Sequence, residues 1–304
     1  MKIYVSKVNE SWVVDRFREE WITYNKDLIT EKIKDSDIIW IISPWVWRKI
    51  SKRELKRKKV LCTIHHLEEK DFKDKNIKEF KKRDVFVDKY HVISKKTKDE
   101  LQKLTNKEII YIPFWVNQNI WYEISNKNTL REKYQLRAKE FIVGSFQRDT
   151  EGSDLISPKL IKGPDRFLKI IKELKKEKEN LTVLLTGKRR NYLINEFKKS
   201  NINYHYFEMA NFSKMNELYN CLNLYIVSSR IEGGPQAIVE CGLTKTPIIS
   251  TDVGIAKEIL SSESIFDMNN FLQAKPNTEH AFKNSKKLTI PKGFEEFKLM
   301  FKSF

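Results

Sequence analysis

The chain has 304 residues, of which 40% are hydrophobic and 12% aromatic, enough for one large core or two medium ones. Its 58 Lys and Arg against 41 Asp and Glu give a net charge of +17, which admits an anionic partner. Many lysines lie in mixed-charge helical stretches, however, where exposure to solvent explains them equally well. Three scattered cysteines argue against a disulfide framework or a structural zinc site and favour a reducing compartment.

The chain contains no long apolar segment. The first five residues are too short for a signal peptide and are predicted to form a strand. The longest apolar stretch, residues 38–47, is interrupted by Ser43 and Pro44 and is too short to span a bilayer. We therefore expect a cytoplasmic protein without a membrane-spanning helix.

Strands and helices alternate through the first half, which predicts a parallel sheet with crossover helices. We expect an exit from this first domain after Pro113 and a short linking helix over 129–137. The expected strands are 2–5, 37–42, 60–64, 90–93 and 109–112, and the expected helices are 13–24, 45–57 and 95–104.

The alternation restarts in the second half. Pro164 opens a helix with one apolar face, and the last eleven residues predict an amphipathic helix with four phenylalanines on one side. Two similar α/β halves indicate two Rossmann-like domains facing a cleft, with ligands at the carboxyl ends of the strands. The expected strands are 141–146, 181–186, 204–207, 222–228 and 247–250.

The most informative segment follows the predicted strand 222–228. Gly233 and Gly234 let the backbone turn and approach a ligand, and Pro235 suits the first position of a helix. The free N–H groups at such a helix start favour a phosphate. Glu232 and Glu240 can accept hydrogen bonds from hydroxyls at two points of one ligand. A sugar nucleotide has this pattern, whereas the simpler alternative is a helix cap and one surface glutamate.

These residues resemble the donor-site signature of family 4 retaining glycosyltransferases. The similarity runs from about residue 141 to residue 260 and is weaker over residues 1–120. The matching positions are Ser229, Glu232, Gly233, Pro235, Thr246, Pro247, Ile248, Ile249, Asp252, Gly254 and Glu258.

The resemblance implies the GT-B fold, an α/β architecture of two Rossmann-like domains that face a cleft. Residues 1–120 would form the acceptor-side domain, and residues 139–275 the nucleotide-sugar-binding domain. Residues 276–304 would form a tail whose helix crosses back to pack on the first domain.

The resemblance also implies roles for single residues. Glu232 would meet the transferred sugar and Glu240 the ribose of the donor, with Gly233, Gly234 and Pro235 lining the donor between them.

Basic residues at two further positions match those that face the donor diphosphate in the family. Arg148 follows the strand 141–146, and Lys162 precedes the helix opened by Pro164. Fixed cations at these positions would stabilise the charge of the departing diphosphate. The alternative for Arg148 is a loop residue paired with Asp149 or Glu151.

A histidine pair ends the strand 60–64. His65 matches a family histidine near the anomeric carbon, and His66 stays open as an alternative, as does an ordinary structural role for both. The class needs no metal, the chain has no Asp-x-Asp motif to hold one, and the nucleotide sugar is expected as a substrate without any cofactor.

The predicted function is therefore that of a metal-independent retaining glycosyltransferase of hexosyl type, with His65 and Glu232 as catalytic residues. It would move a sugar from a nucleotide-sugar donor to a glycan or lipid-linked acceptor in cell-surface polysaccharide synthesis. The alternative is a non-catalytic subunit of the same fold that only binds the nucleotide sugar. Nucleic-acid binding is not expected, because no aromatic-basic motif or zinc finger supports it.

The segment 45–59 combines two tryptophans with eight basic residues and one acid. On one helix, Trp47, Ile50 and Trp45 would face one way, and the segment would lie peripherally on an anionic membrane surface at the inner face. The alternative is that the tryptophans pack against the sheet and the cations are merely solvated.

Overall fold

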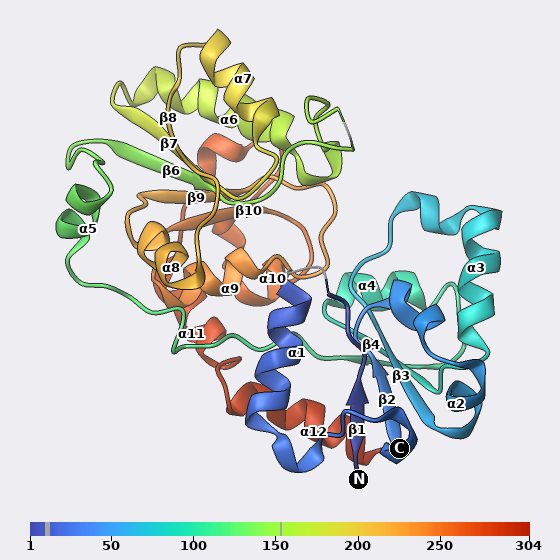
Figure 1. Ribbon diagram of the computed structural model, residues 1–304. Helices are drawn as coiled ribbons and strands as arrows, with labels where there is room; N and C mark the ends of the chain where they lie inside the picture. The colour runs from blue at the N-terminus through green and yellow to red at the C-terminus, as the bar shows by residue number, and fades with distance from the viewer. Residues whose placement is uncertain (10–12, 153) are drawn as a thin grey trace. The chain divides into compact units, whose positions relative to one another are not determined.

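The computed structural model describes residues 1–9, 13–152 and 154–304 (Figure 1). The chain divides into two compact units, one of Met1–Trp115 with Ile290–Phe304 and one of Val116–Thr289. The division thus falls at residue 115, and the linking segment expected before residue 139 lies within the second unit. Each unit has its own parallel sheet and hydrophobic core.

The first unit is built on five parallel strands in the sequential order β1-β2-β3-β4-β5. All four residues of β2 are buried, which is typical of a parallel strand covered on both faces. The strands are β1 Ile3–Val5, β2 Ile38–Ile41, β3 Lys59–Ile64, β4 Lys89–Val92 and β5 Glu108–Tyr111.

Five α-helices belong to the described part of this unit. They are α1 Val13–Tyr24, α2 Lys52–Arg57, α3 Asp74–Asp84, α4 Lys95–Leu101 and α12 Glu295–Lys302. The sequence did not indicate α3, because Phe80 is its only buried residue and its other positions carry almost no apolar periodicity.

The prediction of one helix over 45–57 is wrong. A 3-10 segment, Pro44–Lys49, is followed by extended backbone at Ile50, and α2 then begins after Ser51, whose hydroxyl caps the Glu54 N–H. Trp47 and Ile50 are buried in the core, whereas Trp45 is 53% exposed. The expectation that these three side chains share one outward face is therefore also wrong.

The second unit contains six parallel strands in the order β11-β10-β9-β6-β7-β8. The order reverses between β6 and β9, and in open α/β sheets a ligand binds beyond the carboxyl ends of the strands at such a reversal. The strands are β6 Phe141–Ser145, β7 Leu181–Thr186, β8 Asn203–Phe207, β9 Leu224–Val227, β10 Ile248–Thr251 and β11 Ile265–Phe266.

The first long helix of the second unit buries one apolar face. In α6, the buried face includes Phe167, Ile170 and Ile171, as their spacing predicts. The helices are α5 Lys127–Lys133, α6 Pro164–Glu177, α7 Asn191–Lys199, α8 Phe212–Asn220, α9 Gln236–Leu243, α10 Ala256–Ile259 and α11 Thr278–Lys286.

The expected tail, 276–304, is divided between the units. Helix α11 stays in the second unit against α9, and only Ile290–Phe304 joins the first. There α12 runs beside α1 (Figure 1), and Phe297 lies 5.8 Å from Trp40 and 5.0 Å from Trp115 between ring centroids. The last residues of the chain therefore complete the core of its first half.

We predict that Phe297→Ala lowers the free energy of unfolding of the first unit by about 3–5 kcal/mol, because the fully buried ring leaves a cavity among other aromatic rings. Urea denaturation followed by tryptophan fluorescence measures this change. Leu299→Ala on the same helix is the matched control, since Leu299 is 64% exposed and its removal should change stability by less than about 0.5 kcal/mol. Equal losses in both variants would contradict the packing described here.

Candidate functional site

The loop after β9 is held in place by hydroxyl groups from neighbouring strand ends. The Ser228 hydroxyl donates to the Gly163 carbonyl at 2.8 Å, and the Thr251 hydroxyl donates to the Ser229 carbonyl at 2.7 Å. The β9 loop, the end of β10 and the turn before α6 thus form one hydrogen-bonded edge at the sheet reversal.

An ion pair between Lys162 and Glu232 occupies this edge. The Lys162 Nζ lies 2.6 Å from one carboxylate oxygen of Glu232 and 2.7 Å from the other. The Ser229 hydroxyl donates to the same carboxylate at 3.0 Å, and the Gln147 amide donates to the Lys162 carbonyl at 2.8 Å. The structure therefore brings together two predicted site residues that the sequence assigned to different parts of a ligand.

The turn that carries Lys162 requires glycine at the next position. Gly163 has φ +65°, and a Cβ there would lie 1.9 Å from the Ser228 carbonyl oxygen. Pro164 then begins α6 with its φ already suited to the helix. This close approach lets Lys162 reach across to the β9 loop.

The Gly233-Gly234 pair lies in the loop between β9 and α9, where the sequence predicts a turn. Neither residue has a positive φ, and the left-handed backbone is instead at Gly254, with φ +52°, where a Cβ would lie 2.3 Å from the Gly233 carbonyl oxygen. Pro235 is the residue before α9, whereas the sequence placed it at the first helical position. The small side chains therefore allow the β10 loop to pack against the β9 loop.

Glu240 lies in the second turn of α9 and is only 5% exposed. The Tyr219 hydroxyl, from α8, donates a hydrogen bond to its carboxylate at 3.0 Å. Tyr219 could not be recognised as a site residue from the sequence, because helical spacing predicts burial and says nothing about which group meets its hydroxyl.

Arg148 is half-buried after β6, and its guanidinium forms no ion pair with a described carboxylate, so the suggested pairing with Asp149 or Glu151 is not found. Asp149 instead lies 3.3 Å from Arg190, and both side chains are buried. Burial raises the pKa of Asp149 to about 6, although Arg190 and two backbone N–H groups of α7 act in the opposite direction. Asp149 and Arg190 thus anchor the backbone next to Arg148.

A second pair that the sequence did not indicate closes the turn before α6. Arg230 donates to both Asp165 oxygens, at 2.7 and 2.6 Å, and to the Leu160 carbonyl at 2.7 Å. The hydrogen bond from Arg230 lowers the pKa of Asp165 below its usual value. This planar contact fixes the segment 160–165 on the β9 loop.

In the first unit, His65 follows β3 and is half-buried. Its Nε2–H donates to the Ile42 carbonyl at 2.9 Å, and its ring stacks on Phe114 with centroids 5.9 Å apart. Burial lowers the pKa of His65 to about 4, so the ring is neutral near pH 7 with Nδ1 as an acceptor. His66 is also half-buried, and its Nε2 lies 3.6 Å from a Glu68 oxygen.

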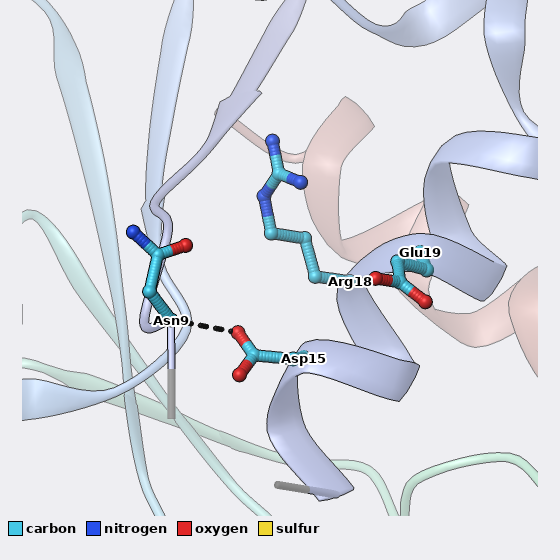
Figure 2. A pocket seen from close by; sticks show the side chains of 4 residues that line it. All are labelled: Asn9, Asp15, Arg18 and Glu19. Carbon is cyan, nitrogen blue, oxygen red and sulfur yellow. Dashed lines mark hydrogen bonds between the residues drawn. The ribbon is translucent and has the colours of Figure 1, made fainter. Parts of the chain in front are cut away.

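The carboxyl end of β1 opens into a hollow of about 300 Å³ lined by Asn9, Asp15, Arg18 and Glu19. Figure 2 shows the Asp15 carboxylate turned toward Asn9, whose N–H donates to it at 3.0 Å. The Arg18 Nε donates to the Val5 carbonyl at 3.2 Å, which ties the α1 side of the hollow to the strand. Carboxylates and a guanidinium in one hollow suit a polar, hydroxyl-bearing ligand.

Within residues 1–9, 13–152 and 154–304, no cluster of three or more His, Cys, Asp or Glu side chains is arranged to hold a metal ion. The same residues include no helix with the length and apolar character needed to cross a bilayer.

We predict that His65 makes stability depend on pH between about 4 and 6.5. In this pH range the His65 ring is protonated in the unfolded chain but neutral in the folded protein. The free energy of unfolding therefore falls as the pH drops. Urea denaturation at several pH values should show a smaller fall for His65→Gln, whose amide keeps the hydrogen bond to Ile42. Parallel pH curves for the two proteins would contradict the low pKa.

Several solved structures share the fold of this chain over nearly its whole length. No curated protein sequence is significantly similar to it. HepE from Anabaena, solved with UDP and glucose, has the same fold with a TM-score of 0.77 at 12% identity, over 100% of both chains. The sucrose-phosphate synthase of Thermosynechococcus elongatus matches with a TM-score of 0.68 at 16% identity, over 98% of this chain and 82% of that one.

A glycosyltransferase from Rickettsia africae matches with a TM-score of 0.67 at 17% identity, over 98% of this chain and 83% of that one. These likenesses show that the chain has the α/β GT-B fold expected from its sequence. Residues 156–289, which carry Lys162, Glu232 and Glu240, match the family model described as glycosyl transferases group 1.

Proposed function

We propose that the protein is a retaining glycosyltransferase that moves a sugar from a nucleotide-sugar donor to a glycan or lipid-linked acceptor. The observation that carries the proposal is the Lys162–Glu232 pair at the sheet reversal. A cation suited to a diphosphate and a carboxylate suited to sugar hydroxyls lie side by side there, and Glu232 shortly precedes the start of α9 in the sequence.

The residue roles follow the resemblance to family 4 enzymes. Arg148, Lys162 and the start of α9, with Gly233, Gly234 and Pro235, would hold the diphosphate. Glu232 would hold the transferred sugar and Glu240 the ribose. His65 is proposed to take part in catalysis as a neutral ring, which fits its lowered pKa.

The proposed reaction needs no carboxylate nucleophile. The acceptor oxygen forms a bond to the anomeric carbon on the face from which the diphosphate leaves, the bond from that carbon to the phosphate oxygen breaks, and a phosphate oxygen takes the acceptor's proton. Fixed cations stabilise the charge that develops on the leaving group, so we propose metal-independent transfer.

The donor and acceptor are proposed from different observations. HepE was solved with UDP-glucose, which makes uridine nucleotides of hexoses the first donors to examine. The hollow at the end of β1 suits the hydroxyls of a glycan, and cell-surface polysaccharide synthesis in the cytoplasm is the setting that we propose.

A thermal-shift panel of UDP-, GDP-, ADP- and CDP-sugars tests the donor proposal, because a specific ligand raises the melting temperature by mass action. One donor class should stabilise the chain well above the others. Stabilisation without any release of nucleoside diphosphate in the presence of glycan acceptors would favour the alternative, a non-catalytic subunit. No stabilisation by any of them would contradict the proposed function.

Calorimetry should distinguish the roles of Glu232 and Glu240 in ligand binding. Glu240→Gln should weaken binding of the bare nucleoside diphosphate about tenfold, because an amide accepts the ribose hydrogen bonds less well than a carboxylate. Glu232→Gln should weaken the sugar-bearing donor more than the bare diphosphate, because its partner is the sugar and its loss leaves Lys162 available to phosphate. If Glu240→Gln affected mainly the sugar-bearing donor and Glu232→Gln the bare diphosphate, the roles assigned to the two glutamates would be wrong.

Loss of Arg148 or of Lys162 should lower the rate of turnover. Arg148→Ala and Lys162→Ala should each lower kcat by about 100-fold or more, because a preorganised contact to the leaving group is lost. Lys169→Ala is the control, since Lys169 is an exposed lysine of α6 and should leave kcat unchanged. A rate that collapses in EDTA and returns with magnesium or manganese would contradict the metal-independent proposal.

Peripheral binding to the inner face of an anionic membrane stays a proposal for the segment 45–59. Trp45 is exposed, and so are Lys52, Arg53, Lys56 and Arg57, each of which contributes about 1 kcal/mol near an anionic surface.

We predict that the protein co-sediments with phosphatidylserine-containing vesicles at low salt, and that this binding falls with salt. Replacing Lys52, Arg53, Lys56 and Arg57 by Gln should abolish it. The matched control replaces four exposed lysines of the second unit, Lys139, Lys169, Lys172 and Lys178, and should keep it. A wild type that stays in the supernatant at low salt would favour a soluble acceptor.

A further inference from the structure

The buried contact between Tyr219 and Glu240 has a consequence for nucleotide binding. We propose that Tyr219 is a positioning residue, whose hydroxyl holds the Glu240 carboxylate in the orientation that receives the ribose hydroxyls of the nucleotide. The inference rests on the proposed function, because it assigns Glu240 to the ribose.

Tyr219 is held at both ends. Its hydroxyl donates to a Glu240 oxygen at 3.0 Å, and its backbone carbonyl accepts a hydrogen bond from the Thr246 hydroxyl at 2.9 Å. Tyr219 is 1% exposed and Glu240 is 5% exposed. This buried contact therefore joins the end of α8 to the middle of α9, the two helices that precede and follow β9 in the sequence.

Aromatic neighbours prevent the phenol ring from turning away. The centroid of the Tyr219 ring lies 4.8 Å from that of Phe146, 5.4 Å from Tyr225 and 5.7 Å from Trp121. Phe146 directly precedes the polar segment that contains Arg148. The ring is thus packed against the residue that follows β6 and against a residue of β9, and its hydroxyl has a fixed direction.

A carboxylate that binds two neighbouring hydroxyls must present its oxygens in one plane and one direction. Its two oxygens have about four acceptor sites, and the Tyr219 hydroxyl occupies one of them and so fixes the plane of the carboxylate. Burial, with the negative charge of Glu240 beside it, raises the pKa of Tyr219 well above its usual value. The hydroxyl therefore stays protonated and donates throughout the physiological pH range.

Tyr225 provides a matched control for a merely structural role. It is also buried and also packs on the Phe146 ring, but its hydroxyl accepts the Phe146 N–H at 3.0 Å, and no hydrogen bond joins it to Glu240 among those of the described residues. Removing either hydroxyl costs a buried hydrogen bond, so both variants should lose some thermal stability. Only the loss at Tyr219 should change how the site recognises ribose.

The test is calorimetry with the nucleoside diphosphate, among UDP, GDP, ADP and CDP, that stabilises the wild type most. Each protein is titrated with the ribose form and with its 2′-deoxy and 3′-deoxy forms. In the wild type, loss of a ribose hydroxyl should weaken binding about tenfold, the effect of one hydrogen bond to a charged group. In Tyr219→Phe this ratio should fall to twofold or less, whereas Tyr225→Phe should keep the wild-type ratio.

The ratio compares ligands on one folded protein, so a change in stability alone does not alter it. If Tyr219→Phe keeps the full discrimination while Glu240→Gln loses it, the positioning role is wrong and the proposed function stands. If both tyrosine variants lose it equally, the effect comes from general packing and the inference is also overturned. If the wild type binds none of the four nucleotides, the proposed function fails and this inference fails with it.

Discussion

The ion pair between Lys162 and Glu232 is the interaction on which the candidate site depends. The two side chains are only 23% and 11% exposed, so the loss of one partner would leave the charge of the other largely uncompensated. Three segments must meet to form the pair: the turn before α6, the β9 loop and, through Gln147, the end of β6. A ligand that brings phosphate to Lys162 and hydroxyls to Glu232 satisfies both charges at one place, which is why we propose a sugar nucleotide.

The sheet order explains why this pair can exist. Lys162 and Glu232 are 70 residues apart in the chain, yet β6 and β9 are neighbours in the second sheet and end at the same edge. The turn at Gly163 brings the cation close enough, because any side chain there would collide with the β9 loop. Tyr219 then holds the Glu240 carboxylate, and Arg190 pairs with Asp149 next to Arg148.

Much of this architecture could be predicted from the sequence, because alternation and helical spacing are local properties. The strands β1–β5 lie within two residues of their expected bounds, and residues 224–243 form the expected strand, turn and helix. The polar helix α3 and the break at Ile50 could not be predicted, since neither has an apolar period. Side-chain partners such as Tyr219 for Glu240 depend on strand order, which periodicity does not contain.

Sugar transfer with retention of configuration is the activity that we propose for this chain. Proton NMR of the anomeric region during slow hydrolysis or transfer from the preferred nucleotide sugar measures it directly. We expect the first product formed to have the same anomeric configuration as the donor. A first product of the opposite configuration, or bound donor without any product, would contradict it.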